Sequence, residues 1–415
     1  MNKRRKKIIR AAMVTTSNGS ITQQKLQQQL PNDLVFGLLM KLEKVKNLHK
    51  YKCVSKSWCS IISSPQFPAS YRSFHRGGLL ISIPERIAGL RQLSFYYSSV
   101  LVEEQPVEPF FCSFKMPVSK FFGGIAEVIN GITCVFYQNV VFVCNVCSGE
   151  KMILPDPVFR DHNSVNTSTK LFLGYDASNS GVYKLLKLRK VERQGTDFDE
   201  LEAEILTLGC GSCSRREVLQ PVAGIVVDGI FSTGYLLVKG VMYWIVNCLD
   251  NQPRLVSFDF KKDRFDLIQP PPDYKFLVHP KEWQFVQFKG HLGLLNSDYV
   301  CFGVHLLDHD GNEAKCWIKQ YIPWPLGSDS EERTAVFVGN LPTGQILFSN
   351  LKLLDQKKSK SACVPIYSYD HQKNRFERLL VGSPPQIRHA TNFGVGVTFL
   401  EENLAPLDFL LSEGH

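Results

Sequence analysis

Two pairs of cysteines have the C-x-x-C spacing that zinc sites and thiol redox sites use. They are Cys144 with Cys147 and Cys210 with Cys213. A zinc ribbon needs its second pair about 15 to 20 residues after the first, and a far longer stretch separates Cys147 from Cys210. A reactive thiol needs a helix N-terminus or a cation to lower its pKa, and the Gly- and Ser-rich segment around Cys213 predicts no helix. We therefore expect structural cysteines, no metal and no cofactor.

The motifs that carry the commonest enzyme chemistries are missing from the sequence. There is no G-x-x-x-x-G-K-[ST], G-x-G-x-x-G, H-E-x-x-H or G-x-S-x-G segment. His75, His279, His291 and His371 have no partner at the spacing that a metal site or a catalytic base requires. These absences favour a protein that is not an enzyme, and they leave open an active site without such a motif.

Acidic residues recur beside aromatic residues in a pattern that could supply either catalytic carboxylates or turns. Asp176, Asp259 and Asp370 each follow a Tyr or a Phe, and another aromatic residue comes six or seven positions later. An Asp side chain accepts hydrogen bonds from the backbone N–H groups of a turn, and aromatic residues pair across the two strands of a hairpin. The pattern predicts a repeated β-hairpin in which the aspartates form turns.

The elements that would carry these hairpins are short and numerous. Runs of β-branched and aromatic residues, separated by Gly, Pro, Asn and Asp, extend from about residue 76 towards the C-terminus. Examples are residues 78–83, 140–143, 185–188, 235–238 and 241–246. Many short strands with frequent turn signals predict a large all-β domain, closed or radial, over residues 76–405.

Length, composition and charge bound the protein class. The 415 residues, 44% hydrophobic and 21% charged, predict a soluble globular protein of two or three domains. The net charge of +9 arises mostly in residues 1–32, which hold seven basic residues and no acidic one. The remainder is nearly neutral, which argues against a basic domain that binds nucleic acid.

Residues 1–29 are a basic, Gln-rich arm for which we expect no folded structure. No apolar segment follows its charges, so the arm does not predict a secretory signal. Lys3, Arg4, Arg5, Lys6 and Lys7 form a patch of the kind that directs nuclear import. We expect a protein of the nucleus, the cytoplasm or both. The alternatives for this arm are a solvated tail without a targeting signal and an organelle transit peptide.

Apolar residues at the spacing of amphipathic helices fill residues 30–67. The first series is Leu34, Leu38, Leu42 and Val45, with Leu39 beside them. The second series ends before Pro65 and comprises Leu48, Tyr51, Val54, Trp58, Ile61 and Ile62. Pro31 predicts the start of a helix whose N-terminus Asn32 and Asp33 favour through capping and the helix dipole. Two or three short helices are expected.

A helical segment of about forty residues is too small to enclose a core. Its apolar side chains must be covered by another protein or by the rest of this chain.

The motifs of this segment resemble the F-box of plant F-box proteins. They follow in order as 30–35, 38–42, 45–48, 51–58 and 61–67, with Leu30-Pro31 at the start, Lys56-Ser57-Trp58 near the end and Pro65-Gln66-Phe67 last. Two departures stand out. Gly37 occupies a position where the family usually has Glu, and Glu43-Lys44 stand where it usually has a single Pro.

The resemblance implies that residues 30–70 dock on a Skp-type adaptor and, through it, on a cullin-RING ubiquitin ligase. The residues expected to bind the adaptor are Leu30, Pro31, Leu34, Leu38, Leu39, Leu42, Val45, Leu48, Tyr51, Val54 and Trp58. Each buried Leu, Val or Trp contributes about 1.5 to 3 kcal/mol, so five or six such anchors would hold a stable interface. Gly37 costs a helix about 0.5 to 1 kcal/mol relative to Ala, which would weaken docking.

The all-β region resembles the F-box-associated domain of plant F-box proteins, which is built as a β-propeller. The resemblance rests on segments that occur in a common order: 172–176, 183–186, 204–209, 240–244, 257–259, 366–370 and 399–404. It implies a fold class of a small all-α F-box followed by a large all-β, β-propeller-like domain. Kelch and WD-repeat propellers fit less well, because double glycines occur only at Gly77-Gly78 and Gly123-Gly124 and no Trp-Asp dipeptide occurs.

Together the two resemblances imply a non-catalytic substrate-recognition subunit of a Skp-cullin-F-box ubiquitin ligase. The propeller would hold a target protein, and proximity would promote its ubiquitination and degradation. Trp283, Trp317 and Trp324 are candidate anchors for the target. The alternatives are a binding propeller outside the ubiquitin pathway, a propeller that acts on a small molecule or carbohydrate, and a nucleic-acid binder that uses residues 1–10.

Overall fold

The structure is a computed structural model. It describes residues 31–41, 45–64, 67, 70, 78–87, 90–99, 111–118, 122–125, 128–137, 140–146, 149–154, 169–178, 182–191, 200–208, 214–218, 235–247, 253–272, 283–297, 301–307, 317–323, 335–340, 344–350, 363–382 and 396–400. The chain divides into two compact units, Met1–Lys41 and Leu42–His415. This division falls inside residues 30–70, and the expected domain boundaries stay predictions. None of the described helices is long and apolar enough to cross a membrane.

Three short helices occupy the segment in which helical spacing was found. They are α2 (Asn32–Met40), α3 (Val45–Lys52) and α4 (Lys56–Ser63). The N-cap residue of α2 is Pro31, which makes no side-chain cap hydrogen bond, and Asn32 is the first residue of the helix itself. Asp33 lies in the first turn, where the helix dipole favours a carboxylate.

The described strands form six antiparallel sheets of four strands each. Sheet 1 contains β24 (Gly396–Leu400), β1 (Gly78–Ile87), β2 (Leu90–Ser99) and β3 (Phe111–Val118). Sheet 2 contains β4 (Phe122–Ile125), β5 (Ile132–Tyr137), β6 (Val140–Asn145) and β7 (Lys151–Ile153). Sheet 3 contains β8 (Thr169–Tyr175), β9 (Tyr183–Val191), β10 (Glu200–Leu208) and β11 (Ser214–Val218).

The remaining three sheets follow the same sequential order. Sheet 4 contains β12 (Tyr235–Val238), β13 (Val241–Asn247), β14 (Pro253–Asp259) and β15 (Arg264–Ile268). Sheet 5 contains β16 (Trp283–Phe288), β17 (His291–Ser297), β18 (Cys301–Leu307) and β19 (Trp317–Pro323). Sheet 6 contains β20 (Ala335–Asn340), β21 (Ile346–Asn350), β22 (Cys363–Asp370) and β23 (Arg375–Gly382).

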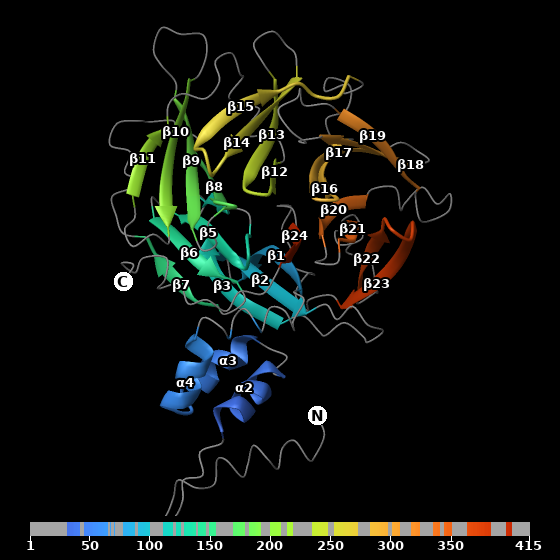
Figure 1. The fold of residues 1–415 in the computed structure, drawn as a ribbon. Helices are drawn as coiled ribbons and strands as arrows, with labels where there is room; N and C mark the ends of the chain where they lie inside the picture. The colour runs from blue at the N-terminus through green and yellow to red at the C-terminus, as the bar shows by residue number, and fades with distance from the viewer. Residues whose placement is uncertain are drawn as a thin grey trace, which may run out of the picture. The chain divides into compact units, whose positions relative to one another are not determined.

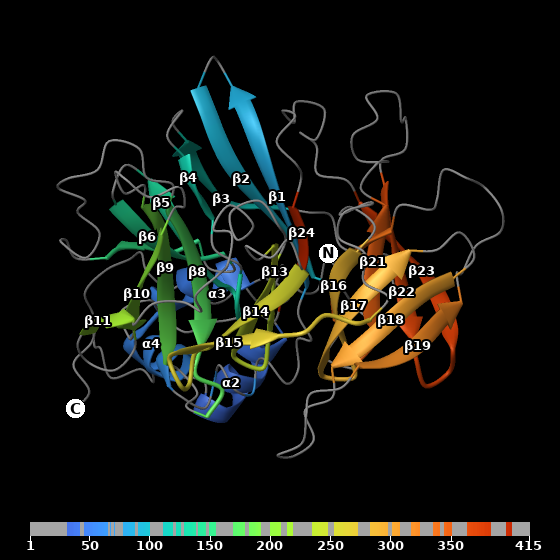
Figure 2. The ribbon, with the colours of Figure 1, turned by 90° about the horizontal axis from the view of Figure 1, so that it is seen from above.

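The sheets are arranged radially in Figure 1, and Figure 2 shows them from a direction at right angles to that view. The core lies between consecutive sheets. Phe172 of sheet 3 meets Trp244 of sheet 4 edge to face, with ring centroids 5.0 Å apart, and both are fully buried. Similar apolar clusters join sheets 2 and 3, sheets 4 and 5, and sheets 5 and 6. This is the propeller-like arrangement of antiparallel sheets that the strand pattern predicts.

Sheet 1 joins the beginning of the β-region to its end. The C-terminal strand β24 pairs antiparallel with β1, and the register places Gly78 opposite Leu400. Strand β24 also lies beside β20 of sheet 6. The backbone hydrogen bonds between β24 and β1 therefore connect the two ends of the array, which removes two exposed strand edges.

The predicted aromatic hairpins are confirmed. Tyr175 lies opposite Tyr183 in the β8–β9 pair, Phe258 opposite Phe265 in the β14–β15 pair, and Tyr369 opposite Phe376 in the β22–β23 pair. The ring centroids of the second and third pairs are each 4.6 Å apart. The first pair joins the first two strands of its sheet in chain order, whereas the other two pairs join the last two strands of theirs.

Candidate functional site

Helix α2 presents one apolar row to solvent and buries the neighbouring row. Leu34 and Leu38 are 57% and 47% exposed, whereas Val35 and Leu39 are 1% and 0% exposed. Residues four apart lie on one face of a helix, so each pair forms a row. The outward row is an apolar surface of the kind that a partner protein covers.

The pair α3–α4 is held by buried apolar residues and leaves others accessible. Leu48, Ile62 and Phe67 are buried. Tyr51 and Trp58 are half-buried, with ring centroids 5.7 Å apart, so the two helices contact each other through these rings. Val54, in the turn between the helices, is 56% exposed.

Helix α4 begins with a side-chain cap. Ser55 precedes the helix in an extended conformation, and its Oγ accepts a hydrogen bond from the backbone N–H of Trp58 at 3.1 Å. This bond satisfies one of the N–H groups that a helix start leaves without a partner. The cap therefore fixes where the Trp58 side chain emerges.

Replacement of Ser55 by alanine is expected to destabilise α4 by about 1 kcal/mol, because the cap hydrogen bond is lost. Hydrogen exchange of the Trp58 amide should become faster, which NMR or mass spectrometry measures. Ser60→Ala is the matched control, since Ser60 lies exposed within the same helix. Equal exchange rates in the two variants would contradict the capping role.

The residues predicted to bind the adaptor fall into four groups, of which the first is the half-buried pair Tyr51 and Trp58. Leu34, Leu38, Val54 and Pro31 are exposed. Leu39 and Leu48 are buried, at 0% and 1% exposure, and their predicted role in adaptor binding stays a prediction. The structure does not describe Leu30, Leu42 or the side chain of Val45. The basic patch predicted to direct nuclear import also lies outside the described residues: Lys3, Arg4, Arg5, Lys6 and Lys7.

The tryptophans predicted to anchor a target have different surroundings. The indole N–H of Trp317 donates to the backbone oxygen of Gln269 at 2.8 Å, and its ring packs against the apolar cluster between sheets 4 and 5. Trp317 therefore has a structural contact within the chain. Trp283 begins β16 but its side chain is not described, and Trp324 lies outside the described residues.

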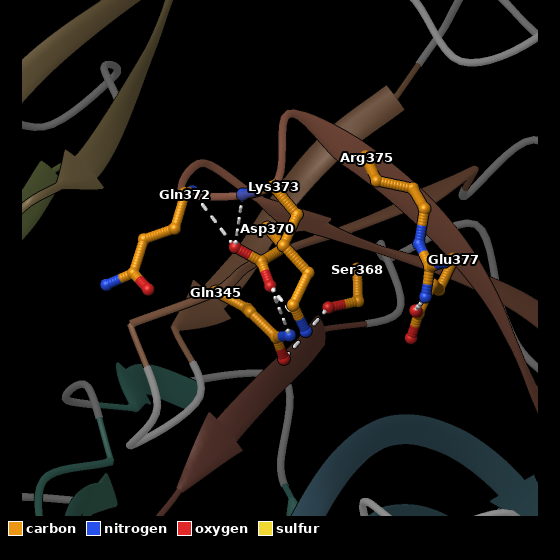
Figure 3. A network of polar contacts seen from close by, with 7 residues as sticks. All are labelled: Gln345, Ser368, Asp370, Gln372, Lys373, Arg375 and Glu377. Carbon is orange, nitrogen blue, oxygen red and sulfur yellow. Dashed lines mark hydrogen bonds and ion pairs between the residues drawn. The ribbon is translucent and has the colours of Figure 1, made fainter.

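The aspartates of the aromatic hairpins act on their turns, as predicted. Asp259 Oδ1 accepts from the backbone N–H groups of Lys261 and Lys262, at 2.9 and 3.1 Å. Asp370 Oδ1 accepts from those of Gln372 and Lys373, at 2.9 and 3.1 Å (Figure 3). Both carboxylates therefore stabilise the turns that follow them.

Further polar groups complete the network around Asp370. The Gln345 amide donates to Asp370 Oδ2 at 3.5 Å, and the Ser368 hydroxyl donates to Gln345 Oε1 at 3.4 Å (Figure 3). The pKa of Asp370 lies below its ordinary value, and the main cause is the hydrogen bond from the backbone N–H of Lys373. The Ser178 hydroxyl does the same for the pKa of Asp176. Such carboxylates stabilise a fold above their unfolded pKa, and the contribution is lost as the pH falls through the lower folded pKa.

Two cysteines of sheet 2, Cys134 and Cys144, are buried among apolar residues. Burial raises the pKa of the Cys144 thiol to about 12, and it also raises the pKa of Cys134. A thiol, unlike a thiolate, is a poor nucleophile and a poor ligand. Within the part of the chain that the structure describes, no three His, Cys, Asp or Glu residues cluster as metal ligands do. Cys147, Cys210 and Cys213 lie outside it.

A family comparison identifies the β-region. The model of the F-box associated beta propeller domain matches residues 88–400, which is more than half of the chain. The chain belongs to this family. The match covers every strand of the six sheets except β1, and the resemblance seen in the sequence is confirmed.

The F-box-associated propeller protein is similar to F-box proteins of Arabidopsis thaliana over most of its length. It is 26% identical to F-box protein At1g47810 over 371 residues, which cover 79% of this chain and 95% of the relative. It is 24% identical to F-box protein At3g61340 over 358 residues, which cover 79% of this chain and 83% of the relative. A third Arabidopsis protein, At1g53550, is 24% identical over 383 residues, which are 90% of each chain.

A comparison of folds adds a weaker similarity. The dipeptidyl peptidase 4 of Porphyromonas gingivalis is 11% identical, with a TM-score of 0.34, over 74% of this chain and 44% of the peptidase. A score this low carries no argument about the F-box-associated propeller.

Several exposed residues of the F-box-associated propeller were not predicted from the sequence. Tyr321 and Ile318 of β19 are 63% and 46% exposed. Lys239 and Lys289 stand before glycine in two tight turns, and both have positive φ. A Lys-Gly pair between two apolar runs was the signal for these turns, although Asn-Gly is the usual one.

Proposed function

We propose that this chain is the substrate-recognition subunit of a Skp-cullin-F-box ubiquitin ligase. Helix α2 and the pair α3–α4 would bind a Skp-type adaptor, and the propeller would bind a target protein for ubiquitination. Membership of the F-box-associated family and the similarity to Arabidopsis F-box proteins support this role. The single observation that carries it is the outward row of α2, Leu34 and Leu38.

The proposed mechanism is proximity. A target lysine held near a charged ubiquitin donor reacts at a higher effective concentration, so this chain need supply no acid, base or metal of its own. We further propose that it works in the nucleus, the cytoplasm or both, with residues 3–7 as an import patch.

Adaptor binding is tested by shortening the outward row of α2. Alanine keeps the helix propensity of leucine, so Leu34→Ala with Leu38→Ala removes the contact and leaves the helix intact. The apolar area lost from the interface should cost about 2 to 3 kcal/mol, or roughly 30- to 150-fold in adaptor affinity. Titration of the full chain with a purified plant Skp-type adaptor measures this affinity.

The matched control is Leu267→Ala, because Leu267 is a leucine of the propeller with 39% exposure. Its adaptor affinity should equal that of the unchanged chain. Adaptor binding that survives in the double variant, or that is absent from the unchanged chain, would remove the basis of the proposal.

A further inference from the structure

Lysines from three sheets meet along one end of the propeller. Lys239-Gly240 joins β12 to β13, and Lys289-Gly290 joins β16 to β17, so both turns link the two inner strands of their sheets. A Cβ atom placed on Gly290 would lie 3.3 Å from both Cε and Nζ of Lys239. The Lys239 side chain therefore reaches from sheet 4 onto the turn of sheet 5 that carries Lys289.

Neighbouring turns extend this arrangement to both sides. In sheet 4, the backbone N–H of Phe260 donates to the oxygen of Gly240 at 3.0 Å, which places the turn of Lys261 and Lys262 beside that of Lys239. In sheet 5, Phe288 contacts His371 of sheet 6, with ring centroids 5.6 Å apart. The turn of His371 also carries Lys373 (Figure 3). We call these five lysines the basic strip: Lys239, Lys261, Lys262, Lys289 and Lys373.

The carboxylates along the basic strip point inward and the ammonium groups point outward. The side chains of Asp259 and Asp370 are 19% and 15% exposed, because they bond the backbone of their turns. The side chains of Lys262 and Lys373, their ion-pair partners, are 62% and 68% exposed. An exposed ion pair contributes little free energy, so these two ammonium groups can bind a carboxylate of a partner molecule instead at little cost.

The two central lysines have no carboxylate partner among the residues that the structure describes. Lys289 Nζ lies 5.1 Å from the centroid of the Phe288 ring and 3.5 Å from Gln320 Oε1, which are both uncharged. Lys239 lies against Gly290. Two exposed cations on adjoining turns repel each other, and an acidic partner would relieve that repulsion.

The local backbone makes lysine an unfavourable choice in both turns. Lys239 and Lys289 have φ of 48° and 51°, in the left-handed region that side chains other than Asn, Asp and Gly rarely adopt. In sheet 2 the equivalent turn has Asn130 before Gly131, with φ of 48°. Turn stability alone would favour Asn at both positions. Residues that are unfavourable for the local backbone conformation are often found at functional sites, which suggests a role for the two lysines.

We propose that the basic strip binds an acidic polypeptide segment, one rich in Asp and Glu, of a partner protein. Single ammonium groups spread over three sheets match carboxylates spread along a chain. Bidentate recognition of a phosphate group uses the paired N–H groups of a guanidinium, and the arginines that adjoin the strip, Arg264 and Arg375, are already paired with Asp266 and Glu377. This interaction is separate from adaptor binding by α2.

The test uses the full chain and a fluorescein-labelled poly-glutamate peptide at low ionic strength. The variant is Lys239→Asn with Lys289→Asn, which removes both central charges and installs the residue that the turns prefer. Without these two ammonium groups, peptide binding should weaken by about tenfold. The thermal midpoint should stay equal or rise, because Asn fits the left-handed turn positions better than Lys. Lys239→Arg with Lys289→Arg should keep the affinity.

The matched control is Lys151→Asn with Lys319→Asn, which removes the same charge from exposed lysines of β7 and β19. An equal loss in this control would show that only net charge matters and would overturn the proposal. So would tighter binding of single-stranded DNA than of the peptide, or competition by inorganic phosphate at equal ionic strength. Undetectable peptide binding to the unchanged chain would also overturn it. Adaptor affinity is measured separately, so failure here leaves the ligase proposal standing.

Discussion

Gly174→Ala is expected to lower the free energy of unfolding by about 3 kcal/mol or more, although it adds a single methyl group. A Cβ atom on Gly174 would lie 2.2 to 2.3 Å from three carbons of the Phe260 ring. Phe260 is fully buried and packs edge to face on Phe258, with centroids 5.0 Å apart. The Phe260 ring cannot stay in place beside a methyl group on residue 174. It must move, and part of the apolar contact that it makes between sheets 3 and 4 is lost.

Urea denaturation of the full chain, followed by tryptophan fluorescence, measures this loss. Gly37→Ala is the matched control, because a Cβ on Gly37 meets nothing within 4 Å and the position is exposed in a helix. It should stabilise α2 by about 0.5 to 1 kcal/mol. In a Phe260→Ala background, Gly174→Ala should cost much less, since the two sites share one space. Wild-type stability of Gly174→Ala would refute the close contact.

Loss of one partner of the Lys184–Asp263 pair is expected to cost about 3 to 5 kcal/mol of stability. Lys184 Nζ and Asp263 Oδ1 are 2.7 Å apart, and each side chain is only 10% exposed. Lys184 belongs to β9 of sheet 3, and Asp263 lies in the turn between β14 and β15 of sheet 4. Lys184→Met leaves a buried carboxylate without its cation, and Asp263→Asn leaves a buried ammonium without its anion.

Asn is the proper replacement for Asp263, because this residue has φ of 51° and Asn tolerates the left-handed region. Combining Lys184→Met with Asp263→Asn should cost clearly less than the two single changes together, since no buried charge remains. The control pair is Arg264–Asp266, whose side chains are 63% and 35% exposed. Asp266→Asn should change stability by less than about 1 kcal/mol. Additive effects at the buried pair would contradict a direct charge interaction.

The features predicted well from sequence are those that depend on neighbours along the chain. An aromatic residue, an Asp and a second aromatic residue within a few positions are enough to form a hairpin, and Phe258, Asp259 and Phe265 behave as expected. The number of sheets and the pairing of β24 with β1 were not predicted. They depend on residues more than 300 positions apart, for which no local signal exists.

The candidate site was predicted only in part for a similar reason. Leu34, Leu38 and Leu39 form adjoining apolar rows on one helix, and periodicity alone does not tell which row faces outward. Trp317 is a candidate target anchor by residue type, but its hydrogen-bond partner Gln269 is remote in sequence and no local pattern reveals it.

The sequence shows no basic run at the basic strip, because Asp259 and Asp370 offset Lys262 and Lys373 and the other three lysines are not consecutive. Only the turn geometry separates inward carboxylates from outward ammonium groups. A charged surface of this kind therefore becomes visible only once the turns are placed in space.

The pairing of β24 with β1 sets the timing of folding during synthesis. The ribosome makes Gly78 more than 300 residues before Leu400, so sheet 1 stays one strand short until β24 has been synthesised. Until then β1 keeps an open edge, and such edges recruit other chains. A chain that stops before Gly396 therefore lacks β24, and β1 has no strand to cover its open edge.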